Sequence, residues 1–384
     1  MDLSKFTSEA PGTLVPTIQG QMAFVPHPLP PKLDHGSLLV PLVDTVNLIG
    51  ELRGAARRIA NPNILILPLQ RKEALTSSAM EGTYTTSDKL LLAEIDEDSL
   101  TDESTLEVRN YLAALRLAQN MLQTYPMSHK VIKAAHHRLL WGLSSERGSS
   151  KKPGEYREEQ NFIGSPTRKI EDARFVPPPP APAQKAMDDL EKYLNREIEN
   201  DAQRLMDLAL VHYQLETIHP FADGNGRLGR MLVTLMSMSA GLFEQPLLYI
   251  SPAVETEKDR YIDLMFSVSS SGSWNEWIEF FFQKVSDSCE ATIALIDRLI
   301  NYQEQLKGLV RENIRSANAI HLVDMLFETP AIDITSASER LSISYTAGKN
   351  LIEKLVDIKI LQEVPGYYPR TFIARGITGI AQGG

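Results

Sequence analysis

The chain has 384 residues, a formal net charge of −10 and one cysteine, and these properties exclude several classes of protein. The negative balance disfavours broad affinity for nucleic acids or anionic membranes. A single cysteine, Cys289, rules out an internal disulfide and suits a reducing compartment. The N-terminal residues lack a signal-peptide pattern, and the longest apolar stretch, around Met231–Phe243, is too short to cross a bilayer. We therefore expect a cytoplasmic protein without membrane contact.

Helical periodicity dominates the sequence and predicts an all-α protein. Residues 1–36 are rich in proline and are expected to form an extended arm that lies over the body. An N-terminal helical region (37–125), a helical core (126–290), a connecting helix (291–315) and a C-terminal module (316–384) are predicted to follow.

A helix is predicted from Pro68 to just before Gly82, since proline near a start and glycine after an end are typical helix boundaries. Glu81 is unusual there, because a carboxylate in the last turn faces the negative end of the helix dipole at a cost of about 0.3–1 kcal/mol. A lone exposed glutamate can tolerate this small cost. A cation close to Glu81 would instead offset it.

Residues 149–182 interrupt the helical pattern. Short aromatic and β-branched patches, among them Asn161–Gly164 and Ala173–Val176, lie beside glycines and favour a β-hairpin. An ordinary surface loop fits the same pattern equally well. Helices are predicted again at Gln184–Glu197 and Arg204–Ile218.

A glycine-rich segment follows the second of these helices and precedes another. His219 stands before a proline, which disfavours the helical conformation at His219. Gly224 and Gly226 allow a turn with positive φ, in which backbone N–H groups converge at the start of the next helix. Since Arg227 and Arg230 lie one turn apart, the segment predicts a site for an anion of several charges, and a polyphosphate fits best.

Two side chains of this segment supply chemistry. Asp223 is a hard oxygen ligand beside the anion site, as suits Mg²⁺. His219 can accept a proton near neutral pH, and Phe221 is expected to point into the core. Each feature alone has a plain structural explanation: a turn, a helix-end histidine, a solvated arginine pair. Their concurrence in twelve consecutive residues favours a functional site.

The segment from His219 to Arg230 matches the motif H-x-F-x-[D/E]-G-N-G-R-x-x-R at every fixed position and so resembles the Fic family. The resemblance implies a helical core and the transfer of AMP from ATP to a hydroxyl of a protein, with release of pyrophosphate. A toxin branch that phosphorylates instead has lysine at the second glycine of the loop, whereas this sequence has Gly226. Residues 149–182 resemble the family's flap, a hairpin that pairs with an extended segment of the target.

The same resemblance assigns the site residues and implies the ligands ATP and Mg²⁺. It makes His219 the base that deprotonates the acceptor hydroxyl, Asp223 the Mg²⁺ ligand and Arg230 the residue that holds the γ-phosphate. Tyr261 lies where the family often has paired tyrosines near adenine, but the second position is Ile262, which supports this role only in part. The complete set predicted to bind ATP is Gly224, Asn225, Gly226, Arg227, Leu228, Gly229, Arg230, Glu81 and Tyr261.

A second motif lies upstream of the first. Ser77, Glu81 and Gly82 match [S/T]-x-x-x-E-[G/N], which resembles the inhibitory motif of Fic proteins that carry an inhibitory helix in the N-terminal region. This resemblance implies that Glu81 pairs with Arg230 and denies it to the γ-phosphate. The two motifs were found independently, and each therefore supports the other.

The C-terminal module, residues 316–384, resembles a winged helix-turn-helix. Its expected order is a helix, a short helix, a turn, a helix capped by Ser344, and a strand–turn–strand around Pro365. It has six basic and seven acidic residues, and so it lacks the basic face that phosphate contacts need. We therefore rank contact with protein above DNA binding.

The sequence thus predicts a protein adenylyltransferase that is held inactive by its own N-terminal helix. Its substrate would be a Ser, Thr or Tyr hydroxyl of a target protein or of the chain itself. Removal of AMP from a modified protein, with Glu81 orienting water, is the nearest alternative, and a DNA-binding regulator with an inactive Fic core is another. The helix predicted at Asp287–Arg311 could form a dimer surface, so a homodimer also stays open.

Overall fold

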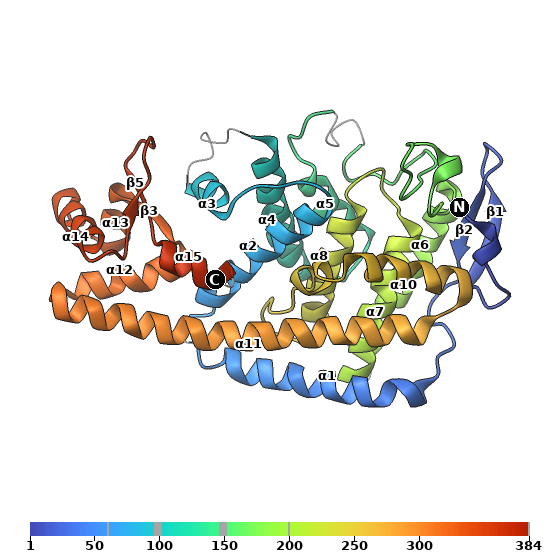
Figure 1. Ribbon diagram of the computed structural model, residues 1–384, viewed down its shortest axis with the longest axis horizontal. Coiled ribbons are helices and arrows are strands. Elements are labelled where there is room, and N and C mark those ends of the chain that lie inside the picture. Colours follow the sequence, from blue (N-terminus) through green and yellow to red (C-terminus); the bar gives the residue numbers. More distant parts are fainter. Residues whose placement is uncertain (60, 96–101, 146–151, 199, 383–384) are drawn as a thin grey trace.

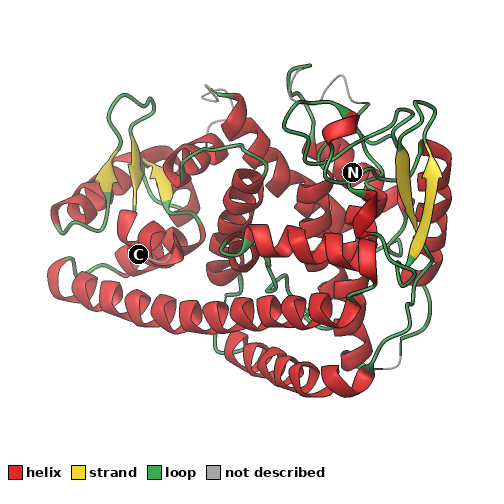
Figure 2. Cartoon of the chain, turned by 45° about the vertical axis from the view of Figure 1, so that its right-hand side comes forward, coloured by secondary structure: helices red, strands yellow, loops and turns green. Residues whose placement is uncertain are grey.

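The computed structural model describes residues 1–59, 61–95, 102–145, 152–198 and 200–382, and helices predominate in this part of the chain (Figures 1 and 2). The predicted all-α class is thereby confirmed. The helices up to the glycine-rich segment are α1 (His35–Ala56), α2 (Asn63–Met80), α3 (Ser87–Ile95), α4 (Glu103–Leu122), α5 (His129–Leu139), α6 (Pro180–Leu194) and α7 (Asp201–Ile218). Those that follow it are α8 (Asn225–Ser239), α9 (Ser251–Glu255), α10 (Lys258–Ser271) and α11 (Trp274–Asn313). Within the described residues, none of the helices combines the length and apolarity that crossing a membrane requires.

The N-terminal arm is more ordered than its prolines indicate. Strands β1 (Gly12–Pro16) and β2 (Met22–Pro26) pair in an antiparallel hairpin, visible at the edge of the molecule in Figure 2. The backbone N–H of Phe24 in β2 donates to the carbonyl of Val176 at 2.9 Å. The arm therefore lies against the segment that the sequence analysis assigned to the flap.

That segment, described from residue 152, forms a shorter hairpin than predicted. Ile163 and Phe175 make one isolated antiparallel bridge, with N···O distances of 2.8 and 3.1 Å, around a 3-10 turn at Ile170–Asp172. Pro166 and Pro177 flank the pair and have no N–H to extend the ladder. The strand pairing is consequently limited to a single bridge.

Helix α7 lies in the middle of the helical core. Leu208, Val211 and Leu215 are completely buried, and the indole of Trp277 in α11 donates to the carbonyl of Ala209 at 3.0 Å. Helix α8 is buried along most of its length as well. Two rigid, buried helices thus hold the ends of the glycine-rich segment.

Helix α11 corrects one prediction, because the helices that the sequence periodicity predicts at Trp274–Lys284 and Asp287–Arg311 are a single element. The sequence between them contains neither glycine nor proline, and Val285 and Cys289 continue the buried face without a break. In Figure 1, α11 runs along the base of the molecule with α1 beside it. The predicted domain limit at residue 290 falls inside α11, and the division into domains stays a prediction.

The C-terminal module has the order of elements that the sequence analysis predicted, with two additions, a strand between the first two helices and a helix at the end. It consists of α12 (Ala317–Glu328), β3 (Ala331–Asp333), α13 (Ile334–Leu341), α14 (Tyr345–Asp357), β4 (Gln362–Glu363), β5 (Thr371–Ile373) and the unpredicted α15 (Arg375–Gln382). The antiparallel sheet has the order β3-β5-β4, and the Ser344 side chain accepts from the N–H of Ala347 to cap α14.

The module packs against α2 and α3. The guanidinium of Arg71 in α2 donates to Glu94 of α3 at 2.7 Å and to the carbonyl of Glu328 in α12 at 3.4 Å. A small apolar cluster joins α3 to the module and contains Leu91, Leu92, Ala331 and Ile373. One helix, α2, therefore contacts both the C-terminal module and, as described next, the glycine-rich segment.

Candidate active site

His219 ends α7 outside the right-handed helical conformation, as the following proline predicts, but it is left-handed, with φ 50° and ψ 59°, and not extended. Its ring Nδ1 lies 3.2 Å from the carbonyl oxygen of Glu216, which can only accept, so Nδ1 carries the proton and Nε2 is the accepting nitrogen. Burial lowers the pKa of His219 to about 4. The imidazole is therefore neutral at physiological pH and able to take up a proton.

Asn225 and Phe221 fix the loop that follows His219. The amide of Asn225 accepts from the backbone N–H of Phe221 and donates to its carbonyl, both at 2.9 Å. The Phe221 ring is fully buried, as predicted, and stacks on His136 with the ring centroids 3.7 Å apart. Gly224 has the predicted positive φ, 74°, and forms the N-cap of α8. The backbone N–H groups at the start of α8 are thus held in place by side chains of the loop itself.

Gly226 corrects the prediction, because it is helical and needs no positive φ. A Cβ at this position would lie 2.3 Å from Oε1 of Glu81. The absence of a side chain at Gly226 therefore leaves room for the Glu81 carboxylate at the end of α2. Sequence spacing alone could not reveal this reason.

Two residues that the sequence analysis did not assign to the site support the loop. His136 accepts from the N–H of Gly154 at 2.9 Å and lies 2.8 Å from the carbonyl of Asp223, to which its other nitrogen donates. Arg157 donates to the carbonyl of His219 at 2.8 Å. Both belong to segments distant in sequence, and only their placement in three dimensions connects them to the motif.

Arg227 is paired with Glu107 of α4, a residue that no motif marks. Its Nη1 lies 2.9 Å from Oε2 of Glu107, and the two side chains are only 4% and 3% exposed. The hydroxyl of Thr83 donates to the same oxygen at 2.6 Å. This ion pair is closed to solvent.

Arg230 contacts the end of α2. Its Nη2 donates to Oε1 of Glu81 at 2.8 Å and to the carbonyl of Ser77 at 2.8 Å, and its Nε donates to the Ser77 hydroxyl at 2.9 Å. Burial opposes the ionisation of Glu81, but the charge of Arg230 outweighs it and lowers the carboxyl pKa. Helix α2 begins at Asn63, before the predicted Pro68, and Glu81 is its C-cap, followed by Gly82 with a φ of +86°.

Asp223 is the one carboxylate of the loop and its side chain is 45% exposed. Its Oδ1 accepts from the N–H of Gly224 at 2.6 Å and lies 4.0 Å from Arg227. Among the described residues there is no group of three or more His, Cys, Asp and Glu side chains that could hold a metal ion. A half-exposed single carboxylate fits a Mg²⁺ ion that takes its other ligands from water and phosphate, but not a metal held by protein alone.

Some of the predicted site residues line one cavity of about 460 Å³, whereas others are not part of its lining, namely Ser77, Gly82, Asp223, Gly224, Asn225, Arg227, Leu228 and Gly229. Tyr261 lies in its wall with its hydroxyl 2.7 Å from Nε2 of His212. The residues around the cavity that carry the predictions or that belong to the flap are Glu81, His219, Gly226, Arg230, Tyr261, Ile163, Gly164, Arg174 and Phe175. His219, Arg230 and the segment predicted to be the flap therefore face the same space.

Comparison with known protein families identifies the domains whose residues surround this cavity. Residues 42–120 match the Fic/DOC family N-terminal domain, and residues 126–237 match the Fic/DOC family domain. The chain is a member of the Fic family. The two matched regions contain the Ser77–Gly82 motif and the His219–Arg230 motif, respectively.

Curated relatives and solved structures agree with this family. The chain is 27% identical over 207 residues to protein adenylyltransferase Fic of Drosophila sechellia and 30% identical over 145 residues to that of Drosophila ananassae. The matches cover 52% and 36% of this chain, but only 37% and 26% of those relatives. A Fic family protein of Desulfovibrio desulfuricans G20 superposes with a TM-score of 0.55 over 90% of this chain and 98% of its own, at 19% identity. A Fic domain containing signaling protein of Bacteroides thetaiotaomicron VPI-5482 gives 0.51 over 67% and 96%, also at 19% identity, and the two structures show the fold alone.

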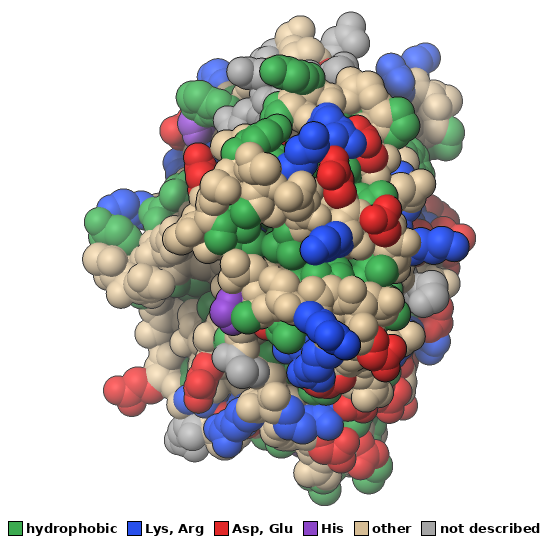
Figure 3. Space-filling view, turned by 90° about the vertical axis from the view of Figure 1, so that its left-hand side faces the viewer, with side chains coloured by type: hydrophobic (Ala, Val, Ile, Leu, Met, Phe, Trp, Pro, Cys, Tyr) green, Lys and Arg blue, Asp and Glu red, His purple; other side chains and the backbone are tan. Residues whose placement is uncertain are grey.

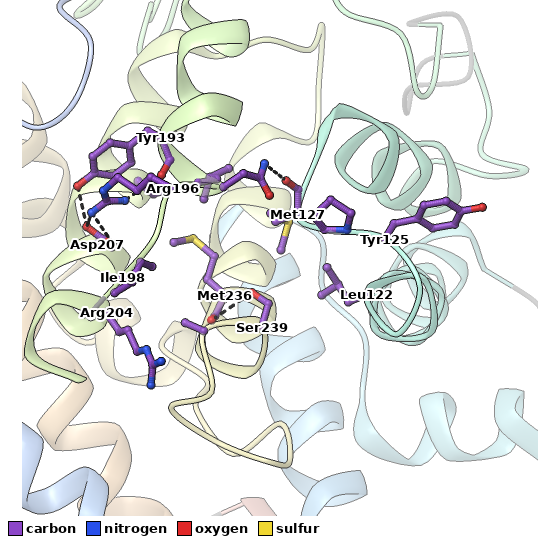
Figure 4. A pocket seen from close by; sticks show the side chains of 15 residues that line it. Leu122, Tyr125, Met127, Tyr193, Arg196, Ile198, Arg204, Asp207, Met236 and Ser239 are labelled. Carbon is purple, nitrogen blue, oxygen red and sulfur yellow. Dashed lines mark hydrogen bonds and ion pairs between the residues drawn. The ribbon is translucent and has the colours of Figure 1, made fainter. Parts of the chain in front are cut away.

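A second cavity of the Fic domain, about 360 Å³, contains none of the predicted site residues (Figure 4). Asp207 lies at its edge and accepts from Tyr193 at 2.6 Å and from Arg196 at 2.7 and 2.8 Å. The Asp207 carboxylate therefore already accepts hydrogen bonds from side chains of the protein itself.

Proposed function

We propose that the chain is a protein adenylyltransferase that transfers AMP from ATP to a Ser, Thr or Tyr hydroxyl of a target protein. The curated relatives named protein adenylyltransferase support this activity for the matched half of the chain. The observation that carries the proposal is the neutral imidazole of His219 beside the N-terminus of α8, in the same cavity as Arg230. A proton acceptor next to a polyphosphate site is what this transfer requires.

His219 Nε2 would accept the proton of the target hydroxyl, whose oxygen would bond to the α-phosphorus of ATP. The bond from that phosphorus to the oxygen bridging to the β-phosphate would break, and pyrophosphate would leave. The N–H groups at the start of α8, with Arg230, would bind the phosphates, and Arg227, closed to solvent beside Glu107, would contribute only its charge. In this reaction the protein mainly positions groups and compensates charge.

Asp223 is the residue that would hold Mg²⁺, since it is the half-exposed carboxylate beside the phosphate site. When bound, the ion neutralises phosphate charge. The contact of Asp223 with the N–H of Gly224 would keep its carboxylate directed along the loop.

The same proposal includes inhibition by α2. The Arg230 guanidinium donates hydrogen bonds to Glu81 and Ser77, and the γ-phosphate would need the same guanidinium. ATP would then bind with its phosphates misplaced for as long as Glu81 stays in position. The inhibitory segment would be Ser77 to Gly82.

Incorporation of label from α-labelled ATP into protein tests this function. Glu81→Gly should label a matched cell lysate and the chain itself much faster than the wild type. Glu255→Gly is the control, because Glu255 is an exposed glutamate at the end of α9, outside the cavity lining. Equal rates for wild type and Glu81→Gly would contradict the inhibition, and absence of labelling by every variant would contradict the transfer.

Removal of AMP from a modified protein is the second candidate, and the partial exposure of the Glu81 side chain supports it. At 40% exposure that carboxylate can reach a water molecule in the cavity that also contains His219. This reaction would need Glu81, whereas transfer would be restrained by it. Release of AMP from a labelled target should therefore be lost in Glu81→Gly if the chain is such a hydrolase.

A further inference from the structure

Glu216 is a carboxylate of the cavity that neither motif includes. It lies one turn before His219 in α7 and lines the same cavity as Glu81 and Arg230. Its backbone carbonyl holds the His219 ring, at 3.2 Å from Nδ1. Its side-chain Oε1 is buried and accepts no hydrogen bond within the described part of the chain. A buried oxygen without a donor is costly, so it calls for a physical reason.

Gly229 provides the space for this carboxylate. A Cβ at position 229 would lie 2.2 Å from Oε1 of Glu216 and 3.1 Å from its Cδ. Helix α8 therefore has a glycine in its interior, where glycine is unfavourable, because the Glu216 carboxylate occupies the place of a side chain. Glu216 and Gly229 therefore form a close contact between α7 and α8.

The charges in the cavity give Glu216 a role. The Arg230 side chain is 3% exposed, whereas that of Glu81 is 40% exposed, so Glu81 is the partner that can leave into solvent. Arg230 would then remain as a buried charge without its main counter-ion, which is strongly unfavourable. Burial raises the pKa of Glu216 to about 7, Arg230 opposes this rise, and the charge of Glu81 adds to it. Departure of Glu81 therefore removes one cause that keeps Glu216 protonated.

We propose that Glu216 is a positioning residue that becomes the counter-ion of Arg230 when Glu81 leaves, until the γ-phosphate of ATP replaces it. This inference rests on the proposed function, because it requires Arg230 to bind the γ-phosphate. Glu216 keeps the guanidinium in place in the open, nucleotide-free site. It also competes with the γ-phosphate, because both acceptors need the same cation.

Nucleotide affinity measured by calorimetry tests the competition. The ligands are α,β-methylene-ATP, which cannot donate AMP, and ADP, which lacks the γ-phosphate. In the Glu81→Gly background, Glu216→Gln should tighten binding of the ATP analogue about tenfold, on the order of one charge-assisted bond, and leave ADP affinity unchanged. With Glu81 present, Glu216→Gln should change neither affinity, since Glu81 remains the counter-ion.

Thermal unfolding provides a readout that a purely structural role would not produce. In the Glu81→Gly background, Glu216→Gln should lower Tm without nucleotide and lower it less with saturating α,β-methylene-ATP. Equal losses of Tm in both conditions, or equal changes in affinity for the ATP analogue and ADP, would overturn the inference. Failure of both nucleotides to bind any variant would instead overturn the proposed function.

The space at Gly229 gives an independent test of the geometry. Gly229→Ala should lower Tm by displacing the Glu216 carboxylate, and adding Glu216→Ala should restore part of the loss by clearing the space. An unchanged Tm in Gly229→Ala, or no recovery in the double variant, would overturn the placement of Glu216 against α8.

Discussion

Two arginines on α8, Arg227 and Arg230, make ion pairs of almost equal length in very different surroundings. Arg227 meets Glu107 at 2.9 Å and Arg230 meets Glu81 at 2.8 Å. Both guanidiniums are buried. The difference lies in the acids, because Glu107 is closed to solvent and Glu81 is substantially exposed at the end of its helix.

This difference separates a permanent contact from a reversible one. Glu107 cannot leave without carrying a charge through the protein interior, and Thr83 adds a hydrogen bond that holds it. Glu81 can rotate outward and be solvated at once. Bond length alone would rank the two pairs as equivalent, whereas the cost of solvating each acid distinguishes them.

The largest expected effect should come from removing the imidazole of His219 in the Glu81→Gly variant. His219→Ala combined with Glu81→Gly should transfer AMP about 10²–10⁴-fold more slowly than Glu81→Gly alone, because opening the Arg230 pair cannot replace a general base. ATP affinity should be retained, since the phosphates contact α8 and the arginines. The measurement is label incorporation together with ATP binding. Unreduced labelling by the double variant would remove His219 from this role.

Breaking each pair from its acidic side should cost very different amounts of stability. Glu107→Gln should lower the free energy of unfolding by about 3–5 kcal/mol, because it leaves Arg227 as an uncompensated buried charge. Glu81→Gln should cost under about 1 kcal/mol, because Glu81 is already partly solvated and Glu216 remains as a counter-ion for Arg230. Urea unfolding of the two variants measures the contrast. Similar losses would mean that exposure does not decide which pair is permanent.

Substitution of Asp223, which lies 4.0 Å from Arg227, should have a smaller effect on transfer. Asp223→Ala should weaken the apparent affinity for Mg²⁺ about tenfold, measured as the Mg²⁺ dependence of transfer by Glu81→Gly. Excess EDTA should stop transfer by the parent variant. Full activity in EDTA would contradict a role for the metal, and an unchanged Mg²⁺ dependence would place the ion elsewhere.

Mildly acidic pH should change neither the protonation state of His219 nor the ion pair between Glu81 and Arg230. The pKa of His219 is lowered to about 4 by burial, so the imidazole stays neutral until the pH falls towards that value. Arg230 keeps the pKa of Glu81 below its usual value, so the pair also persists. In Glu81→Gly combined with Glu216→Gln, neither carboxylate beside Arg230 can titrate, so kcat/KM for transfer should stay constant from pH 8 to about 5.5. An acid limb near pH 6.5 in this double variant would show that His219 is not desolvated in the working enzyme.

The smallest expected effect concerns DNA binding by the C-terminal module. On the face shown in Figure 3, Lys and Arg side chains are interspersed with Asp and Glu. The full chain should not retain duplex DNA at physiological salt, because a balanced surface releases few counterions on binding. Gel retardation at about 150 mM salt measures this. Sequence-specific retention would favour the DNA-binding alternative.

The local parts of the site could be read from the sequence, and the partners that lie far away in the chain could not. The end of α7 at His219, the buried Phe221 and the capping Gly224 follow from their immediate neighbours. Glu107 and Glu216 carry no recognisable spacing relative to the motif. They become visible only when α4, α7 and α8 are packed together.

The fold shows the same limit. Helix periodicity located most helices, but it placed the start of α2 at Pro68, although the helix continues through this proline from Asn63. It also divided α11, because local pattern does not reveal that one buried face continues from the core to the module. The hairpin of the arm is also hydrogen-bonded to Val176, a long-range contact that a local pattern does not reveal.

The contact between α2 and the C-terminal module has an evolutionary consequence. Arg71 donates to Glu328 across that boundary, and Leu91 and Leu92 pack on Ala331 and Ile373 from the other side. Removing the module would expose this apolar surface and leave Arg71 without one acceptor. The module therefore cannot be exchanged between proteins as an independent cassette, and substitutions on its inner face should covary with substitutions on α2 and α3.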